Sequence, residues 1–128
     1  MIITKKEIET YLTEVKTAIR EDRYTIARNT RRQENIDLFT DYIIDENDAK
    51  EILLSLKVTD FSNITPNYKP GFEHENLYVF GKEVNLLERF GNNLKTVSLY
   101  IKFNKLDNSY VIVISFHEQR FPLSYYFR

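Results

Sequence analysis

The sequence of 128 residues contains no cysteine, and only three glycines and three prolines. The absence of cysteine excludes disulfide bonds, thiolate catalysis and zinc sites built from thiolates. No stretch approaches the roughly 20 apolar residues that a membrane-spanning helix needs, and residues 1–15 contain no continuous apolar core typical of a secretion signal. We therefore expect a soluble, cytoplasmic protein with no membrane partner.

Short catalytic motifs are also missing from the chain. Glycine-rich phosphate loops, a nucleophile elbow and the HExxH zinc motif are all absent, which excludes most enzyme classes that a short motif identifies. The 18 basic and 19 acidic residues nearly cancel, and this balance argues against a protein that coats nucleic acid without specificity. Locally, however, the charged residues in 16–32 are mostly basic and those in 33–51 mostly acidic, so a basic patch beside an acidic one is possible.

The first half of the chain has the patterns of helices. Residues 1–128 are expected to form one domain, because single domains commonly have about 100–150 residues. Thr4 and Glu7 fit a capping box, and apolar residues at helical spacing predict a helix over residues 4–21. Residues 23–27 alternate like a short strand, after which Asn29 or Thr30 caps a second predicted helix. Asp45 is expected to cap a third helix.

The second half has the patterns of strands. Residues 62–76 contain two prolines and a glycine and are expected to form a loop. Short strands are predicted from residue 77 to 80 and from 84 to 90, with Gly81 as a β-bulge. A hairpin over residues 96–120 follows, and the alternating tail is expected to add an edge strand or to pack over the sheet. The fold class is therefore α+β, with N-terminal helices packed on a C-terminal antiparallel β-sheet.

The hairpin carries the candidate site. Pairing Phe103 with Tyr110 places Ile101 opposite Ile112, Leu99 opposite Ile114 and Val97 opposite Phe116, which gives one wholly apolar face. The other face then carries Thr96, Ser98, Tyr100, Lys102, Val113, Ser115 and His117. In this register Tyr100 lies roughly 13 Å along the sheet from the partner of His117.

Several polar side chains on this face and near it suit RNA chemistry. Histidine as a residue type can give and take protons near neutral pH, so His117 suits proton transfer during cleavage of RNA by its own 2′-hydroxyl, with no metal ion. Tyr100 suits stacking on a base, and Lys102 suits neutralising a phosphate. The alternative for His117 is an ordinary hydrogen-bonded histidine at the edge of the sheet. The alternative for Tyr100 and Lys102 is that they are ordinary surface residues, because tyrosine and lysine are common on solvent-facing strands.

Two other groups are weaker candidates. His74 and Glu75 could join His117 as metal ligands or supply a general base, but two histidines without a fixed spacing do not define a metal site, and we expect neither metal nor cofactor. A set of arginines could hold an RNA backbone, or could form a solvated face paired with the neighbouring acids. Its members are Arg23, Arg28, Arg31 and Arg32.

Five segments, in this order, carry a family resemblance: RYTIARNT, LLSLKVTDF, ENLYVF, SLYIKF and VIVISFHE. Over residues 20–120 the chain resembles the MqsR family of bacterial toxins, which belong to the RelE-like superfamily and are made together with an antitoxin. The resemblance implies a RelE-like domain that cleaves messenger RNA without metal. The tyrosine of the family's Tyr-x-Lys strand falls on Tyr100, with Lys102 beside it, while a family lysine falls on His117 and a family glutamine on Glu75. The family's lysine after Asp-Phe has no equivalent, because Ser62 and Asn63 follow there.

The sequence therefore predicts a toxin endoribonuclease whose partners are messenger RNA and a cognate antitoxin. In this hypothesis Glu75 or Glu118 takes the proton of the 2′-hydroxyl, and His117 protonates the departing 5′-oxygen. Lys102 and Arg120 stabilise the charged phosphorane, and Tyr100 stacks on a base. The alternative is a non-catalytic module of the same fold that binds a protein through its aromatic sheet face or its tail, residues 121–128.

Overall fold

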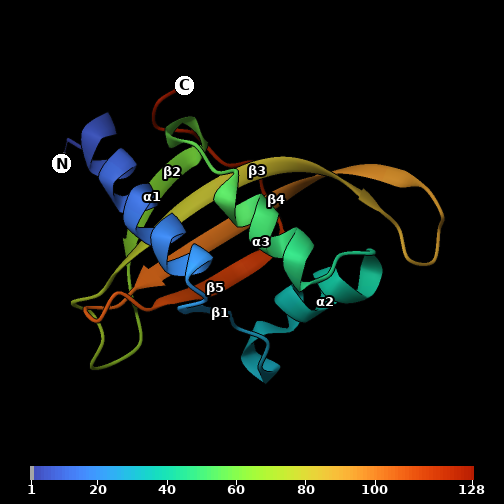
Figure 1. Cartoon of the computed structure of the whole chain (residues 1–128), viewed down its shortest axis with the longest axis horizontal. Helices are drawn as coiled ribbons and strands as arrows, with labels where there is room; N and C mark the ends of the chain where they lie inside the picture. The colour runs from blue at the N-terminus through green and yellow to red at the C-terminus, as the bar shows by residue number, and fades with distance from the viewer. Residues whose placement is uncertain (1) are drawn as a thin grey trace.

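Helices precede most of the sheet in this chain, whose computed structural model describes residues 2–128 (Figure 1). The helical elements are α1 (Lys5–Arg20), a 3₁₀ turn (Thr30–Arg32), α2 (Gln33–Asp41), α3 (Glu46–Leu54) and a second 3₁₀ turn (Val58–Asp60). The strands are β1 (Tyr24–Ile26), β2 (Phe61–Pro66), β3 (Asn76–Leu87), β4 (Leu94–Lys105) and β5 (Val111–Glu118). The predicted α+β class is confirmed.

The predicted caps at the starts of α1 and α3 are confirmed, whereas α2 begins at Gln33, beyond the predicted cap at Asn29 or Thr30, and has no side-chain cap. Thr4 accepts a hydrogen bond from the Glu7 amide at the start of α1, and Asn29 accepts one from Arg31 at the first 3₁₀ turn. Asp45 and Asp48 form a reciprocal capping box at the start of α3. Such side chains satisfy backbone amides that have no partner within the helix. None of the helices within residues 2–128 is long and apolar enough to cross a membrane.

The sheet has five strands in the order β1-β5-β4-β3-β2. It is mixed rather than purely antiparallel as predicted, because β1 pairs with β5 in parallel. The expectation of a loop over residues 62–76 was wrong for its first part, which pairs with β3 as strand β2. The turn-forming residues Pro70 and Gly71 lie beyond β2, whereas Asn63 to Thr65 have no such residue to interrupt pairing.

The long strand β3 is continuous through Gly81, so the predicted bulge there is wrong. A side chain at Gly81 would collide with Tyr125 and would lie 2.9 Å from Leu123, both in the tail. Glycine is therefore needed at this position because the tail passes directly over the strand. The tail itself forms no strand and packs over the sheet, which is one of the two predicted outcomes.

The core lies between the sheet and helices α1 and α3, which cover one face of it in Figure 1. Its centre is aromatic: Phe80 packs edge-on against both Phe61 and Phe103, with ring centroids 5.5 and 5.7 Å apart. Helix α2 lies at the other end of the sheet, beside β5. The face of the sheet that points away from α1 and α3 is called the outer face below.

The predicted hairpin register was wrong. Ile101 lies opposite Phe116 rather than Ile112, and Phe103 lies opposite Val113. A bulge between these pairs leaves Ile114 as the extra residue, since Lys102 pairs with Ser115. Val113 is buried in the core and not on the outer face as predicted. The run from Val111 to Phe116 is apolar at almost every position, so its pattern does not show which residues face inward.

Candidate functional site on the outer face

Four side chains from β4 and β5 form the centre of the candidate site. Tyr100 and Lys102 of β4 lie directly opposite His117 and Ser115 of β5. Residues opposite each other in an antiparallel pair point to the same face, and that face is the outer one because Ile101 and Phe103 between them are buried in the core. The corrected register therefore brings Tyr100 and His117 into contact, where the predicted register held them apart.

His117 is positioned by its two neighbours. Its ring stacks on Tyr100 with centroids 5.3 Å apart and planes 14° apart. Nδ1 lies 2.8 Å from the carbonyl oxygen of Glu118, and because a carbonyl can only accept, Nδ1 must carry the hydrogen. In the neutral ring Nε2 then holds a free lone pair, which makes it a proton acceptor. The side chain is 15% exposed, so a ligand can reach it.

Lys102 lies on the same face, with its ammonium nitrogen 5.9 Å from the centre of the Tyr100 ring. Partial burial lowers the pKa of Lys102 below its usual value of 10.5, and the positive charge of Arg32 lowers it further. Burial also raises the pKa of the Tyr100 hydroxyl, which therefore stays neutral. The site thus combines a neutral aromatic surface with an ammonium group that releases its proton more readily than an exposed lysine does.

Glu34 of α2 joins the site, although the sequence did not indicate it. Its Oε2 lies 3.7 Å from Nδ1 of His117 and accepts a 2.8 Å hydrogen bond from Arg120. A pocket of about 280 Å³ opens between these side chains and the tail. Its lining residues are Glu34, Tyr100, His117, Arg120, Phe121, Pro122 and Leu123. Glu34 is one of seven acids in residues 33–51, and no spacing within that run distinguishes it.

The two predicted general bases do not lie beside His117. Glu118 pairs with Leu99, whose side chain faces the core, and its carboxylate accepts a 2.8 Å hydrogen bond from the hydroxyl of Tyr42. Glu118 therefore points to the face opposite to His117. Glu75 accepts 3.0 Å hydrogen bonds from the amides of Asn67 and Asn104. Since Asn104 is four residues along β4 from Tyr100, Glu75 lies at the far end of the outer face.

Of the four predicted arginines, only Arg32 acts electrostatically on the site, through Lys102. Arg23 donates to Glu21 and to the carbonyl of Ser109, near the start of β5. Arg28 pairs with Glu46 at the start of α3, and its guanidinium lies 4.2 Å above the Phe39 ring. The side chain of Arg31 is exposed. The arginines therefore do not form the single basic patch that their spacing suggested.

His74 lies in the exposed loop between β2 and β3, where it lines a separate cavity with Glu75. The structure does not bring it to His117. Among residues 2–128, no three side chains of the histidine, aspartate and glutamate types gather closely enough to hold a metal ion. The polar groups at the candidate site are an imidazole, a phenol and an ammonium group, which can transfer protons, stack on a ring and neutralise charge.

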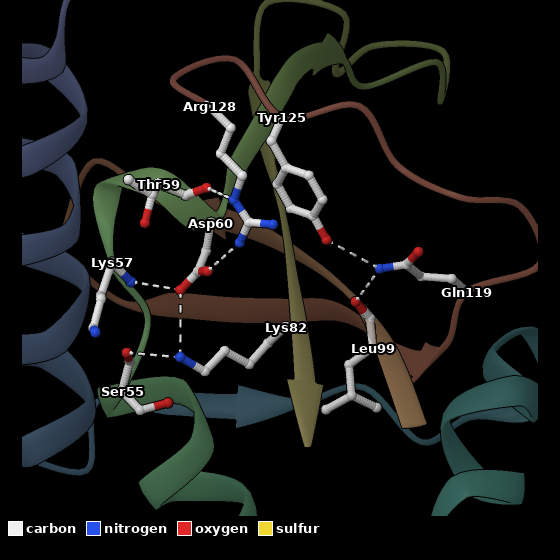
Figure 2. A network of polar contacts seen from close by, with 9 residues as sticks. All are labelled: Ser55, Lys57, Thr59, Asp60, Lys82, Leu99, Gln119, Tyr125 and Arg128. Carbon is white, nitrogen blue, oxygen red and sulfur yellow. Dashed lines mark hydrogen bonds and ion pairs between the residues drawn. The ribbon is translucent and has the colours of Figure 1, made fainter. Parts of the chain in front are cut away.

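The tail after β5 crosses the outer face and is fastened at both ends, as Figure 2 shows. The side chain of Gln119 donates to the carbonyl of Leu99 and lies 3.4 Å from the Tyr125 hydroxyl. Arg128 donates to the carbonyl of Thr59 and to the buried carboxylate of Asp60, and Lys82 lies 3.6 Å from the same carboxylate. These contacts hold Phe121 and Leu123 against the rim of the pocket beside His117.

The fold and the site together define the class: an α+β protein with a histidine, a tyrosine and a lysine on the outer face of its sheet. Comparisons of the chain with protein-family models, with curated protein sequences and with solved structures find no match in any of the three. The resemblance to the MqsR toxins therefore stays a prediction from the sequence.

Proposed function

We propose that this protein is an endoribonuclease that cleaves single-stranded messenger RNA without a metal ion, as the toxin of a toxin–antitoxin pair in the cytoplasm. The observation that carries the proposal is the contact between His117 and Tyr100 on one face of the sheet, with Lys102 beside them. These three groups suit cleavage by the RNA's own 2′-hydroxyl: a proton acceptor and a cation for the reaction, and an aromatic ring that can hold a base.

The reaction is a transfer of the phosphorus atom from one oxygen to another. Nε2 of His117 takes the proton of the 2′-hydroxyl while the 2′-oxygen bonds to phosphorus. The bond from phosphorus to the 5′-oxygen breaks, and Lys102 gives its proton to that oxygen. The products are a 2′,3′-cyclic phosphate and a 5′-hydroxyl end. The lowered pKa of Lys102 favours this role, because proton transfer is most efficient when the pKa of the donor lies near the working pH.

The surrounding side chains support the same reaction. Arg32 adds positive charge near Lys102, where the phosphorane carries an additional negative charge. The pocket beside Tyr100 and His117 has mostly apolar walls, which suit a nucleobase that stacks on the Tyr100 ring. Glu34 holds Arg120 at the rim of this pocket, within reach of the RNA backbone. In the proposed reaction the general base is therefore His117, and not Glu75 or Glu118 as predicted from the sequence.

The test is incubation of the purified protein with a defined single-stranded RNA in EDTA, followed by mapping of the product ends. We expect 2′,3′-cyclic phosphate ends, and a loss of about 10²–10⁴-fold in rate for His117→Ala. His74→Ala is the matched control, since it removes the chain's other histidine from an exposed loop, and it should keep full activity. RNA that stays intact with the wild-type protein, or equal rates for His117→Ala and wild type, would contradict the proposal.

The rival function is a non-catalytic module that binds a protein partner. Phe121 favours it, because this side chain is 79% exposed at the rim of the site. Tyr125 and Phe127 are less available, since Tyr125 packs over Gly81 and Phe127 packs against the core. Expression in cells separates the two functions. A toxin nuclease arrests growth only while His117 is present, whereas a binding module leaves transcripts intact with either variant.

A further inference from the structure

On the side away from β4, strand β3 has a stretch of backbone without a partner, between its pairing with β2 and its contact with Ile43. Strand β2 pairs with it only as far as Phe80, and pairing resumes where the carbonyl of Leu87 accepts a hydrogen bond from Ile43. The Leu87 carbonyl points away from β4, and alternation along the regular strand gives the backbones of Glu83 and Asn85 the same direction. Among the described residues, neither backbone has a partner on that side.

A groove runs along this open edge, between β3 and the flank of α3. Its volume is about 410 Å³, and Figure 1 shows α3 passing close to β3 here. Apolar side chains from both elements line it, together with two carboxylates of α3. The residues concerned are Ile43, Ile52, Val84 and Leu86, with Asp48 and Glu51. The combination of an open strand edge and a partly apolar groove is the arrangement to which extended peptides add as an extra strand.

The charge beside this edge has one sign. Glu51 on α3 and Glu83 on β3 are both exposed, and neither forms an ion pair with any residue from 2 to 128. Asp48 adds a third carboxylate, which accepts the Asp45 amide. Lys82, which precedes Glu83 on β3, is already held by Asp60 and by the carbonyl of Ser55. A basic ligand therefore finds carboxylates without partners on both sides of the edge.

The pair of strands β3 and β4 has a second open edge, on β4, where the charge is different. The backbones of Leu94 and Thr96 point away from β3, beyond the point where Gln119 donates to the carbonyl of Ser98. Lys95 is the charged residue between them, and it lies 4.0 Å from Glu88. This β4 edge lacks the carboxylates that flank the β3 edge. The two edges thus allow an electrostatic preference to be separated from simple strand addition.

We infer that the β3 edge binds an extended segment of a partner protein in which basic residues alternate with apolar ones. The segment adds as a strand whose backbone pairs with Glu83 and Asn85. Its apolar side chains face Ile52, Val84 and Leu86 in the groove, and its basic side chains lie on the opposite face, beside Glu83. Glu51 adds negative charge at the groove next to the edge. This inference does not depend on RNA cleavage, because the edge lies apart from His117 and takes a different ligand.

The test uses the full chain, labelled with ¹⁵N, and a capped peptide of about eight residues in which lysine alternates with valine. Backbone pairing slows amide hydrogen exchange, so we expect slower exchange at Glu83 and Asn85 and unchanged exchange at Thr96. The double variant Glu51→Lys/Glu83→Lys should bind the peptide at least tenfold more weakly. Both substitutions are at exposed positions, so the fold is expected to persist.

Two controls accompany this titration. Glu9→Lys makes the same kind of charge change on the exposed side of α1, and it should leave the affinity within twofold. A peptide in which glutamate alternates with valine should fail to protect Glu83 and Asn85. Equal protection of Thr96, equal binding of the glutamate peptide, or no protection at saturating lysine peptide would each overturn the inference. RNA cleavage is measured separately, so its absence would leave this result unaffected.

Discussion

At the scale of single residues, Lys102 shows a conflict between stability and the proposed activity. Its ammonium group is partly buried and lies near the positive charge of Arg32, and both effects lower its pKa. A lowered pKa means that the folded protein binds the proton less tightly than the unfolded chain does. Keeping Lys102 charged therefore costs stability, as is common where a side chain is retained for function.

Lys102→Met should consequently raise the free energy of unfolding and abolish RNA cleavage. The stability cost of the charged Lys102 in the wild-type protein is lost as the pH rises from the lowered pKa of Lys102 through 10.5, the value for an ordinary lysine. The advantage of the variant is therefore largest below that window and disappears above it. Urea unfolding measured from pH 7 to 11 checks this dependence.

Lys6→Met is the control for the lysine prediction, because Lys6 lies exposed on α1. Its effect on the free energy of unfolding should be within about 0.5 kcal/mol at every pH, as is usual for surface substitutions. If the difference between Lys102→Met and wild type did not change between pH 7 and 11, the assigned pKa shift would be wrong.

At the scale of elements, the contact between α2 and β5 depends on one buried side chain. Strand β1 pairs with β5 only up to Val113, so the next backbone groups of β5 need other partners. Asn35 of α2 supplies them: its amide donates 2.9 Å to the carbonyl of Ile114, and its oxygen accepts 2.8 Å from the amide of Phe116. Asn35 thus places α2, and with it Glu34, beside His117.

Asn35→Ala should destabilise the protein by about 2–4 kcal/mol, because it leaves a buried carbonyl and a buried amide of β5 without partners. Thermal and urea unfolding measure this loss. The substitution should also weaken the contact between Glu34 and Arg120. Gln33→Ala, two residues earlier and exposed, removes only a hydrogen bond to Asp37 and should cost less than about 0.5 kcal/mol. Similar losses for the two variants would contradict the assigned role.

At the scale of the whole molecule, the tail links β5, inside the sheet, to the edge strand β2. It leaves β5 at Gln119, crosses β3 over Gly81, and returns to β2, where the Tyr126 amide donates 3.0 Å to the carbonyl of Phe61. Figure 2 shows the polar contacts with Asp60 and Leu99 that hold it. The tail therefore covers part of the outer face and leaves uncovered the part that carries Tyr100 and His117.

Gly81→Ala should release the tail, because the added methyl group meets the side chains of Tyr125 and Leu123. We expect a loss of about 1–3 kcal/mol in the free energy of unfolding, and faster amide exchange at Tyr126. Gly91→Ala is the matched control, since its methyl group meets only the flexible carboxylate side chain of Glu88. Unchanged exchange at Tyr126 in the Gly81 variant would show that the tail is not held by this close approach.

Much of the fold could be predicted because its signals are local. The caps at Thr4 and Asp45 and the periodic apolar residues that follow them are properties of short segments, so α1 and α3 were expected where they occur. Helix α2 begins later than expected, because Asn29 caps a 3₁₀ turn that precedes it. The alternation in β4 likewise set which side chains point to the outer face. Tyr100 and Lys102 therefore shared a face whatever strand lay next to them.

The sequence by itself thus determined the elements and the chemical character of each strand face, because both follow from the spacing of neighbouring residues. Only the tertiary structure decided which residues meet. The bulge at Ile114 set the register that stacks His117 on Tyr100, and the packing of α2 through Asn35 brought Glu34 beside them. Register and packing depend on contacts between distant segments, and the almost uniformly apolar β5 carries no local pattern that fixes either one.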